Sequence, residues 1–266
     1  MKFRDAVRLM LSPSSFRARR ELERVRNRPR YTLGTTTLFG RPLEYVDSSS
    51  YFFLHEEIFK QEIYAFQTTS AQPRIIDGGA NIGLSVLYFK KRFPAAHIIA
   101  FEADPSVADV LRRNLAAQGL GDVVVRAEAL WTHETELSFH REGADGGQVT
   151  SATGAGTCRV SAVPLGQFLH APVDFLKLDI EGAEFEVLRS CHGQLGMVDK
   201  AFIEYHSKAD QPQSLADLLL LLREAGFRCF VSAPSVFSPK PFLEIKTYNG
   251  FDMVLNIFCL RPTARP

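Results

Sequence analysis

The stretch that most constrains the fold is RIIDGGANIG, from Arg74 to Gly83, where a short apolar segment runs through an acid into a glycine turn. Ile75 and Ile76 form the kind of β-branched run that a parallel strand buries on both faces, and Asp77 falls where that strand would end. Glycines let a ligand approach the backbone without a Cβ in the way, and they tolerate positive φ. The pattern predicts a strand, a turn and a helix around a ligand. An ordinary glycine-rich connection is the structural alternative.

A second acid, Glu102 in IIAFEADP, ends the next apolar segment. Two strand-and-helix units with an acid at each strand end indicate a nucleoside site, because the second acid accepts hydrogen bonds from ribose hydroxyls. A dinucleotide fold uses G-x-G-x-x-G to bring backbone amides against a pyrophosphate. Here Asp77 precedes the glycines, and its negative charge suits a cationic ligand better than a diphosphate. S-adenosylmethionine, which carries a sulfonium and an amino group, is therefore the expected cofactor.

The predicted cofactor site combines these two turns with the end of the third strand. Glu102 would bind the ribose hydroxyls, Asp77 and the glycine turn would hold the methionine end, and Glu128 and Ala129 would border the adenine. The full set is Asp77, Gly78, Gly79, Ala80, Asn81, Gly83, Glu102, Ala103, Glu128 and Ala129.

From Arg74 onward, apolar segments of strand length alternate with helical ones. The expected strands are 75–77, 97–101, 123–127, 174–180, 201–204, 227–231 and 253–260. Asp104 and Pro105 mark a helix start and Gly119 lies near its stop. The last connection is short for another helix, so we expect the final strand to pair antiparallel with the sixth. These segments predict an α/β fold, a doubly wound and mostly parallel sheet.

Before this sheet, residues 35–47 are typical of a hairpin, and residues 54–66 place apolar side chains at helical spacing. Three aromatic rings near that helix are interpreted either as a lid over the site or as packing. They are Tyr51, His55 and Tyr64. Residues 143–157 hold five glycines and no periodicity, which predicts a loop. That loop is either a lid on the acceptor side or an ordinary surface excursion.

A chain of 266 residues is long enough for one large α/β domain with an N-terminal extension. We divide it into a basic extension and hairpin over residues 1–50 and a cofactor-binding domain over residues 51–266. Hydrophobic residues make up 45% and charged residues 23%, as in ordinary globular proteins. The net charge of +1 gives no reason to expect a nucleic-acid partner.

Positive charge is concentrated at the start, where residues 1–30 hold ten Lys and Arg against three acids. The apolar side of this segment would consist of Phe3, Val7, Leu9, Met10 and Leu11. It is interpreted as weak docking to a membrane surface or a protein, or as a solvated helix. No apolar run approaches the ~18 residues of a spanning helix, and the start lacks a signal-peptide pattern, so we expect a cytoplasmic protein.

The four cysteines lie 30 or more residues apart without a C-x-x-C pair, so they indicate neither a zinc site nor a redox motif. Carboxylates and His206 after the fourth and fifth strands could bind Mg²⁺. Acids at strand ends serve hydrogen bonding more often, and the sequence prediction therefore includes no metal.

With these segments in place, the chain resembles the FkbM family of S-adenosylmethionine-dependent methyltransferases over roughly residues 50–260. The resemblance rests on EIFKQEIYAF, IIDGGANIGLSVLYFK, IIAFEADP and, most specifically, FLKLDIEGAEFEVL followed by IEYH. Where the family commonly has Glu-Pro-Asp-Pro, this chain has Ala103 in place of the first proline, which should leave the ribose contact intact. Where the family often has Leu-Asp before the fourth strand, Gly166 follows Leu165.

The resemblance implies a Rossmann-like seven-stranded sheet with an antiparallel last strand. It also implies methyl transfer to a hydroxyl oxygen, often on a sugar, glycan or secondary metabolite. The acceptor would thus be a small molecule or a glycan, and the oligomeric state stays open. Two other classes are considered: a nicotinamide-dependent oxidoreductase or epimerase, and a non-catalytic nucleoside-binding module. Asp77 and the lack of a Tyr-x-x-x-Lys pair argue against the first, and intact acids argue against the second.

The predicted catalytic residues are Asp179, Glu181, Glu204 and His206, at the ends of the fourth and fifth strands. Ligands of an open α/β sheet bind beyond the carboxyl ends of its strands, so these side chains should share an edge with Asp77. A neutral hydroxyl needs a base to receive its proton. His206 is the first choice because its neutral form is available near pH 7, with Glu204 or Asp179 orienting it. Glu181 would bind acceptor hydroxyls or cap the next helix.

Overall fold

The computed structural model describes residues 13–142, 146–150 and 156–262. Its centre is a seven-stranded sheet in the order β12-β13-β11-β10-β3-β4-β5. The strands are β3 (Arg74–Gly78), β4 (His97–Phe101), β5 (Val124–Arg126), β10 (Val173–Leu178), β11 (Val198–Lys208), β12 (Arg228–Ser232) and β13 (Phe251–Leu260). Strands β5, β4, β3, β10 and β11 are parallel, and β13 lies antiparallel between β11 and β12. The expected fold class is confirmed.

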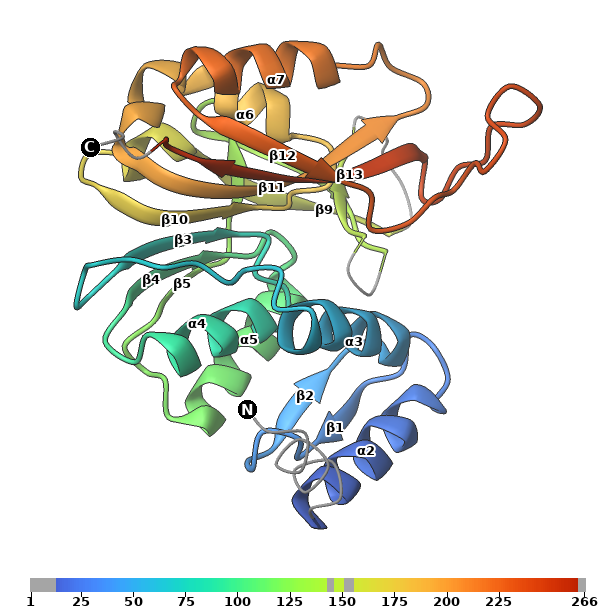
Figure 1. Ribbon diagram of the computed structural model, residues 1–266. Helices are drawn as coiled ribbons and strands as arrows, with labels where there is room; N and C mark the ends of the chain where they lie inside the picture. The colour runs from blue at the N-terminus through green and yellow to red at the C-terminus, as the bar shows by residue number, and fades with distance from the viewer. Residues whose placement is uncertain (1–12, 143–145, 151–155, 263–266) are drawn as a thin grey trace, which may run out of the picture.

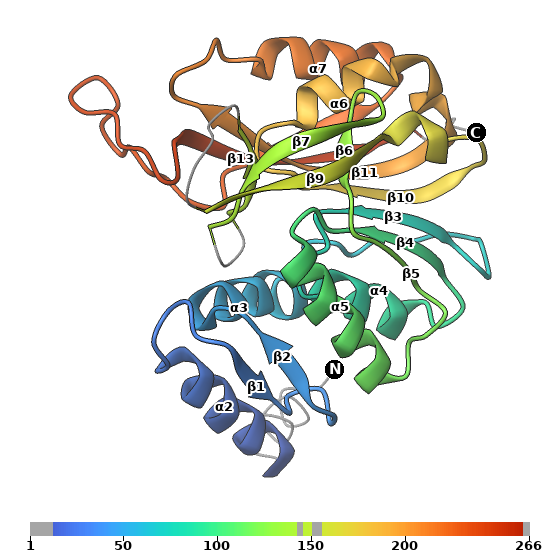
Figure 2. The same ribbon diagram turned by 180° about the vertical axis from the view of Figure 1, so that it is seen from behind.

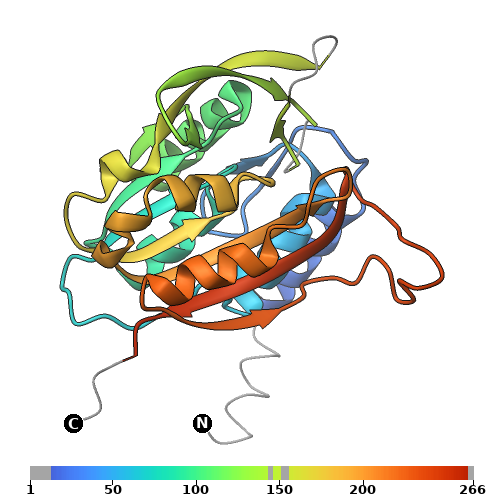
Figure 3. The same cartoon turned by 90° about the horizontal axis from the view of Figure 1, so that it is seen from above.

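Helices cover both faces of this sheet (Figures 1 and 2). Helices α4 (Leu84–Arg92) and α5 (Pro105–Gln118) lie on one face, and α6 (Glu184–Ser190) and α7 (Leu215–Glu224) on the other. The view from above shows α6 and α7 lying over the sheet (Figure 3). Each face buries its own apolar cluster, one beneath α4 and α5 and one beneath α6 and α7. The sheet is thus buried on both faces, as its β-branched and apolar strands require.

The predicted start and stop of α5 are both confirmed. Asp104 is the N-cap, and its Oδ1 accepts a hydrogen bond of 2.8 Å from the Ser106 backbone N–H. Gly119 is the C-cap, with φ of 77°. Local capping chemistry therefore fixes this helix independently of its packing.

The strand order reverses beside β3, because the chain continues from β3 to β4 on one side while β10 lies on the other. A reversal of this kind leaves a crevice beyond the carboxyl ends of the strands at that point of the sheet. Asp179 directly follows β10, and the glycine turn directly follows β3. The topology therefore brings together the two segments that the sequence marks as functional.

The N-terminal extension packs against the domain through α5. It contains α2 (Pro13–Arg26) and the confirmed hairpin of β1 (Gly34–Thr36) and β2 (Leu43–Tyr45). Asn114 on α5 accepts from the Glu44 backbone N–H and donates to the Glu44 and Ile82 carbonyls. Leu22 and Val25 of α2 are buried in the same apolar cluster as α4. Phe3, Val7, Leu9, Met10 and Leu11 lie outside the described residues.

The helix expected over residues 54–66 is wrong in both bounds. Helix α3 (Ser48–His55) begins earlier, because Asp47 is its N-cap and accepts a hydrogen bond from the Ser50 backbone N–H. This helix includes residues 50 and 51, between which the two predicted domains were divided. A π-helix, η1 (Glu56–Lys60), follows. Glu62 then has φ of 54°, which ends helical geometry before residue 66. The predicted apolar spacing reflects burial of an irregular segment, because Ile58, Phe66 and Tyr64 are all buried.

A second, four-stranded sheet between β5 and β10 was not predicted. It consists of β6 (Ala129–Trp131), β7 (Thr135–His140), β8 (Gln148–Val149) and β9 (Thr157–Pro164), in the order β6-β9-β7-β8. The expected loop over 143–157 therefore contains β8 and the first residue of β9, whereas 143–145 and 151–155 lie outside the described residues. Two 3-10 helices, η2 (Leu165–Phe168) and η3 (His192–Met197), flank β10 and β11. None of the helices in the described ranges is long and apolar enough to cross a membrane.

Candidate active site

A pocket opens at the carboxyl ends of β3, β4, β10 and β11. It is lined by parts of both predicted sites: Gly79, Ala80, Asn81, Glu102, Ala103, Glu128, Ala129, Asp179, Glu181 and Glu204. Predicted cofactor-binding and catalytic residues thus share one cavity.

Gly79 is at the sharpest point of the turn after β3. Its φ is 78°, and an added Cβ would meet the Asp179 carbonyl oxygen at 1.8 Å. Glycine is therefore required here for two reasons, the positive φ and the close approach of the β10 segment. The turn after β3 and the catalytic loop after β10 are in direct backbone contact at this point.

Asp77 lies beneath this turn and is not among the residues that line the pocket. Its carboxylate is fully buried, accepts a hydrogen bond of 2.5 Å from the Ser85 hydroxyl and pairs with the Lys177 ammonium at 3.4 Å. Burial raises the pKa of Asp77, and Lys177 opposes the rise. The Asp77 carboxylate therefore stabilises the turn from beneath it and does not face the pocket, where the methionine end of a cofactor was predicted to bind. Gly78 and Gly83 also lie outside the lining.

Glu102 faces the pocket from the end of β4. Its Oε2 accepts from the Asn81 backbone N–H and its Oε1 from the Asp104 backbone N–H, both at 2.9 Å. Burial raises the pKa of Glu102 to about 7, although both backbone donors favour the ionised form. The carboxylate therefore ties the turns after β3 and β4 together while one side of it stays open to a ligand.

The opposite wall comes from the unpredicted second sheet and from α3. Phe139, Val149 and Phe53 line the pocket beside Glu128, whose Oε1 accepts from Arg126 at 2.9 Å. Sequence reasoning missed these apolar residues because nothing local distinguishes them from core. Of the aromatic rings considered for a lid, Tyr64 lines the pocket, and Tyr51 and His55 do not.

Lys177, inside the buried strand β10, is the residue that sequence reasoning most underrated. Its ammonium donates to the Gly79 carbonyl at 2.6 Å and pairs with Asp77 at 3.4 Å and Asp179 at 3.3 Å. Burial lowers the pKa of Lys177, but Asp179 and Asp77 outweigh it, and the pKa is raised. A charged residue within an apolar strand was the available signal, because a buried charge needs a partner.

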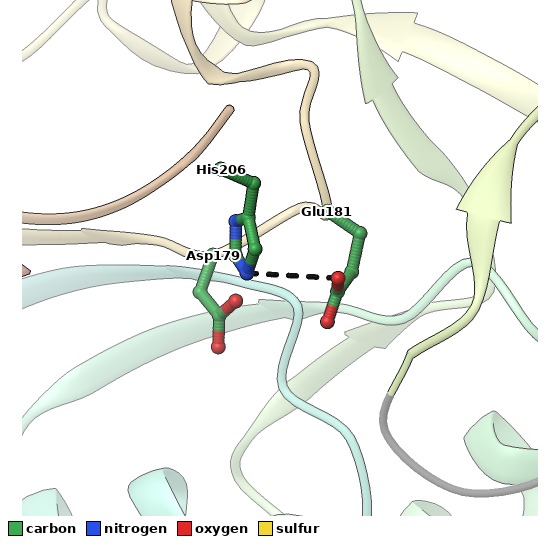
Figure 4. A group of neighbouring side chains, drawn as sticks. All are labelled: Asp179, Glu181 and His206. Carbon is green, nitrogen blue, oxygen red and sulfur yellow. Dashed lines mark ion pairs between the residues drawn. The ribbon is translucent and has the colours of Figure 1, made fainter. Parts of the chain in front are cut away.

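Asp179, Glu181, Glu204 and His206 come together as predicted, although β11 continues past residue 204 and carries His206 within it. His206 is 4% exposed, and its Nε2 lies 3.6 Å from Glu181 Oε2 and 3.8 Å from Glu204 Oε1. Figure 4 shows Asp179 and Glu181 on either side of the imidazole. The side chains of Glu204 and His206 share one face of β11 because strand side chains alternate.

Glu184 holds this loop in place. It is buried at the start of α6, and its Oε1 accepts from the backbone N–H groups of Ile180 and Gly182 at 3.1 and 3.0 Å. The same oxygen lies 3.0 Å from His206 Nδ1. Glu184 therefore caps the loop and orients the imidazole.

Two carboxylates near Asp179 have raised pKa values. Burial and the negative charge of Asp179 raise the pKa of Glu204 to about 8 and that of Glu57 to about 7. Burial lowers the pKa of His206, but Glu181 and Glu184 outweigh it, and the pKa is raised well above its ordinary value. A raised pKa favours the imidazolium form while the site holds no ligand, which weakens the prediction that His206 is the base.

A doubly wound sheet with a glycine turn, a carboxylate facing the pocket and an acid cluster at one edge is typical of a Rossmann-like methyltransferase. The methyltransferase FkbM domain matches residues 77–229. The chain therefore belongs to the FkbM methyltransferase family.

Similar proteins include three named methyltransferases. Methyltransferase 1 of Beauveria bassiana is 25% identical over 74% of this chain and 87% of its own length. Methyltransferase sdnD of Sordaria araneosa is 45% identical over 29% of each chain, so this chain spans under a third of it. Hexuronic acid methyltransferase AglP of Haloferax volcanii is 29% identical over 54% of this chain and 59% of its own.

Among solved structures, a methyltransferase FkbM from Methylobacillus flagellatus aligns over 91% of this chain and 59% of that one, with 13% identity and a TM-score of 0.47. M. jannaschii TYW2 in complex with AdoMet aligns over 88% of this chain and 89% of that one, with 14% identity and a TM-score of 0.48.

Proposed function

We propose that this protein transfers a methyl group from S-adenosylmethionine to a hydroxyl oxygen of a sugar, glycan or secondary metabolite. The observation that carries the proposal is the single pocket in which Glu102 and the Gly79 turn meet Asp179 and Glu204. One end offers backbone amides and a carboxylate for a nucleoside, and the other offers a cluster of acids for a polyhydroxylated acceptor.

Three observations support S-adenosylmethionine as the ligand of the cofactor end. Glu102 is fixed by two backbone N–H groups yet open to the pocket, so it can accept hydrogen bonds from both ribose hydroxyls. Gly79 removes the Cβ that would close the turn. Apolar side chains of the second sheet lie beside Glu128 and Ala129, where a purine would pack. The bound cofactor supplies a methyl group on a sulfonium.

The acceptor end positions a hydroxyl and removes its proton. Correct placement behind the methyl group contributes several kcal/mol to such displacements, and a positioned base ~10²- to 10⁴-fold. We assign the base to Glu204, because its carboxylate faces the pocket and its pKa, raised to about 8, makes the ionised form a stronger base than an ordinary carboxylate. Asp179, by contrast, is paired with Lys177. Asp179, Glu181 and His206 would then hold the acceptor.

The acceptor class follows from this chemistry and from one relative. Carboxylates accept hydrogen bonds from several hydroxyls at once, as a sugar or polyol presents them. The Haloferax relative is named for a hexuronic acid. We therefore expect a carbohydrate-like acceptor with adjacent hydroxyl groups.

Calorimetry with S-adenosylhomocysteine and with NAD tests the proposal on the full chain. We expect one molecule of S-adenosylhomocysteine to bind per chain and no heat from NAD. Binding of NAD alone would instead support an oxidoreductase. A panel of sugars and phenols with S-adenosylmethionine then tests the acceptor class by release of S-adenosylhomocysteine.

A further inference from the structure

We propose that Asp179, Glu181 and His206 form a binding site for a divalent cation of the Mg²⁺ and Mn²⁺ class, located at the acceptor end of the pocket. The role of the cation in the reaction rests on the proposed methyl transfer, whereas the geometry of its site does not. It replaces the sequence prediction that included no metal.

The three side chains are spaced as ligands of one ion. Each offers one ligand atom, and the three atoms lie within 4.8 Å of one another. Ligands about 2.1 Å from an octahedral ion lie roughly 3 to 4 Å apart, so side-chain shifts of about 1 Å would complete the site. His206 Nε2 and Glu181 Oε2, at 3.6 Å, are already within that spacing.

His206 supplies the observation that distinguishes this cluster from ordinary acids at a strand end. Its side chain is 4% exposed, yet the nearest acceptors to Nε2 are carboxylate oxygens at 3.6 and 3.8 Å, beyond hydrogen-bond distance. Figure 4 shows Nε2 directed into the space between Asp179 and Glu181. Nε2 is thus a buried ring nitrogen whose ion pairs with Glu181 and Glu204 are longer than hydrogen bonds, which leaves space for a cation between the ring and the carboxylates.

The other ring nitrogen of His206, Nδ1, contacts a carboxylate, as is typical of metal-binding histidines. Nδ1 lies 3.0 Å from Oε1 of Glu184, which is 1% exposed and fixed in turn by two backbone N–H groups. A carboxylate that accepts from one ring nitrogen leaves the lone pair of the other nitrogen for a metal and fixes the ring's orientation. Glu184 would therefore be a positioning residue for the site.

The charge balance of the pocket also favours a cation. Asp179, Glu181, Glu204 and Glu57 all line it, whereas Lys177 is the one ammonium among its lining residues in the described ranges. Lys177 pairs with Oδ2 of Asp179, and a carboxylate has a second oxygen for an ion. A ligand set of oxygen atoms with one imidazole suits Mg²⁺ and Mn²⁺ better than it suits softer metals.

The site narrows the acceptor class. Three protein ligands occupy half of an octahedron and leave positions for water or for two neighbouring acceptor oxygens. Vicinal diols and hydroxy acids present such pairs of oxygens. The cation would hold the acceptor with its hydroxyl toward Glu204, and acceptors with an isolated hydroxyl would bind weakly.

Electron paramagnetic resonance with Mn²⁺ tests the proposal, since binding removes the signal of the free ion. The full chain is titrated in the presence of saturating S-adenosylhomocysteine. We expect one site per chain. We also expect affinity to fall at least about tenfold in Glu181→Gln and in Asp179→Asn, and to be unchanged in Glu186→Gln. Glu186 is an appropriate control because it lies on α6 and pairs with Arg189, outside the cluster.

Absence of Mn²⁺ binding to the wild-type chain would overturn the inference, as would equal binding in Glu181→Gln and Asp179→Asn. Calorimetry on the same samples separates this result from the proposed function. Normal S-adenosylhomocysteine binding without Mn²⁺ binding removes the metal site alone. Mn²⁺ binding without S-adenosylhomocysteine binding keeps the metal site and removes the methyltransferase proposal.

Discussion

The two ends of the pocket hold their carboxylates differently. At the cofactor end, Glu102 accepts from two backbone N–H groups supplied by neighbouring turns, so short stretches of chain fix its position. At the acceptor end, Glu204 and Glu181 lie 3.8 and 3.6 Å from His206. Glu204 and His206 belong to β11, whereas Glu181 belongs to the loop after β10, far away in the sequence. The first arrangement is preorganised by backbone. The second places like charges close together, and burial with the charge of Asp179 raises the pKa of Glu204.

The largest expected effect is at the acceptor end. Glu204→Gln keeps the size of the side chain but removes the proposed base, so turnover should fall by ~10²- to 10⁴-fold. S-adenosylhomocysteine affinity should stay within a few-fold, because Glu102 and the Gly79 turn are untouched. Initial rates and calorimetry measure the two effects. Glu224→Gln, an exposed residue on α7, is the control. Near-normal turnover in Glu204→Gln would return the role of base to Asp179 or His206.

At the cofactor end, Gly79→Ala should be more damaging than another glycine substitution of the same conformation. Its Cβ would meet the Asp179 carbonyl oxygen at 1.8 Å, whereas a Cβ at Gly40, with φ of 80°, meets nothing within 4 Å. Both variants pay roughly 1 to 2 kcal/mol for positive φ. Only Gly79→Ala should lose further stability and S-adenosylhomocysteine affinity. Thermal unfolding and calorimetry of the pair measure the difference, and equal losses would contradict the contact.

Loss of the Glu102 carboxylate should weaken cofactor binding and leave the fold intact. A charge-assisted hydrogen bond contributes ~1.5 to 3 kcal/mol, so Glu102→Ala should weaken S-adenosylhomocysteine binding roughly tenfold or more. Circular dichroism should show a folded protein. Unchanged affinity in calorimetry would remove Glu102 from the ribose site.

The pKa of Glu102 makes this end of the pocket sensitive to pH. Burial raises the pKa to about 7, opposed by the backbone N–H groups of Asp104 and Asn81 and by Lys177, and assisted by the charge of Asp104. The ionised form accepts from the ribose more strongly, so affinity should rise roughly tenfold from pH 6 to pH 8. Since a raised folded-state pKa favours the protonated form, the stability from this group is lost as pH rises from about 4.5 to about 7. Calorimetry should show a flatter profile for Glu102→Gln.

The smallest expected effect on the site is removal of residues 1–30. The pocket's lining residues all lie beyond this segment, so cofactor affinity should be unchanged. Stability should fall, because Leu22 and Val25 are buried and Arg30 pairs with Asp47, the N-cap of α3. Thermal unfolding and calorimetry check the two outcomes. Loss of cofactor binding in a still-folded truncated protein would place the extension within the site.

Sequence patterns predicted most residues of both ends of the pocket. Seven of the ten residues predicted for the cofactor line the pocket, and the three exceptions have a common cause. Asp77, Gly78 and Gly83 shape the turn from below, and a local pattern cannot distinguish a residue that forms a turn from one that faces its ligand. Similarly, the spacing over residues 54–66 recorded burial correctly and helix bounds incorrectly, because tertiary contacts can bury irregular chain.

The sequence by itself determined the features that arise from neighbours along the chain. These are the alternation of strands and helices, the caps of α5 at Asp104 and Gly119, and the acids that end β3 and β4. Only the tertiary structure decided the pairings across the sheet. Lys177 bridges Asp77 and Asp179, and Glu184 orients His206 toward Glu181. The physical reason is that charge interactions depend on distance in space and on burial, and neither is written in the spacing of residues along a chain.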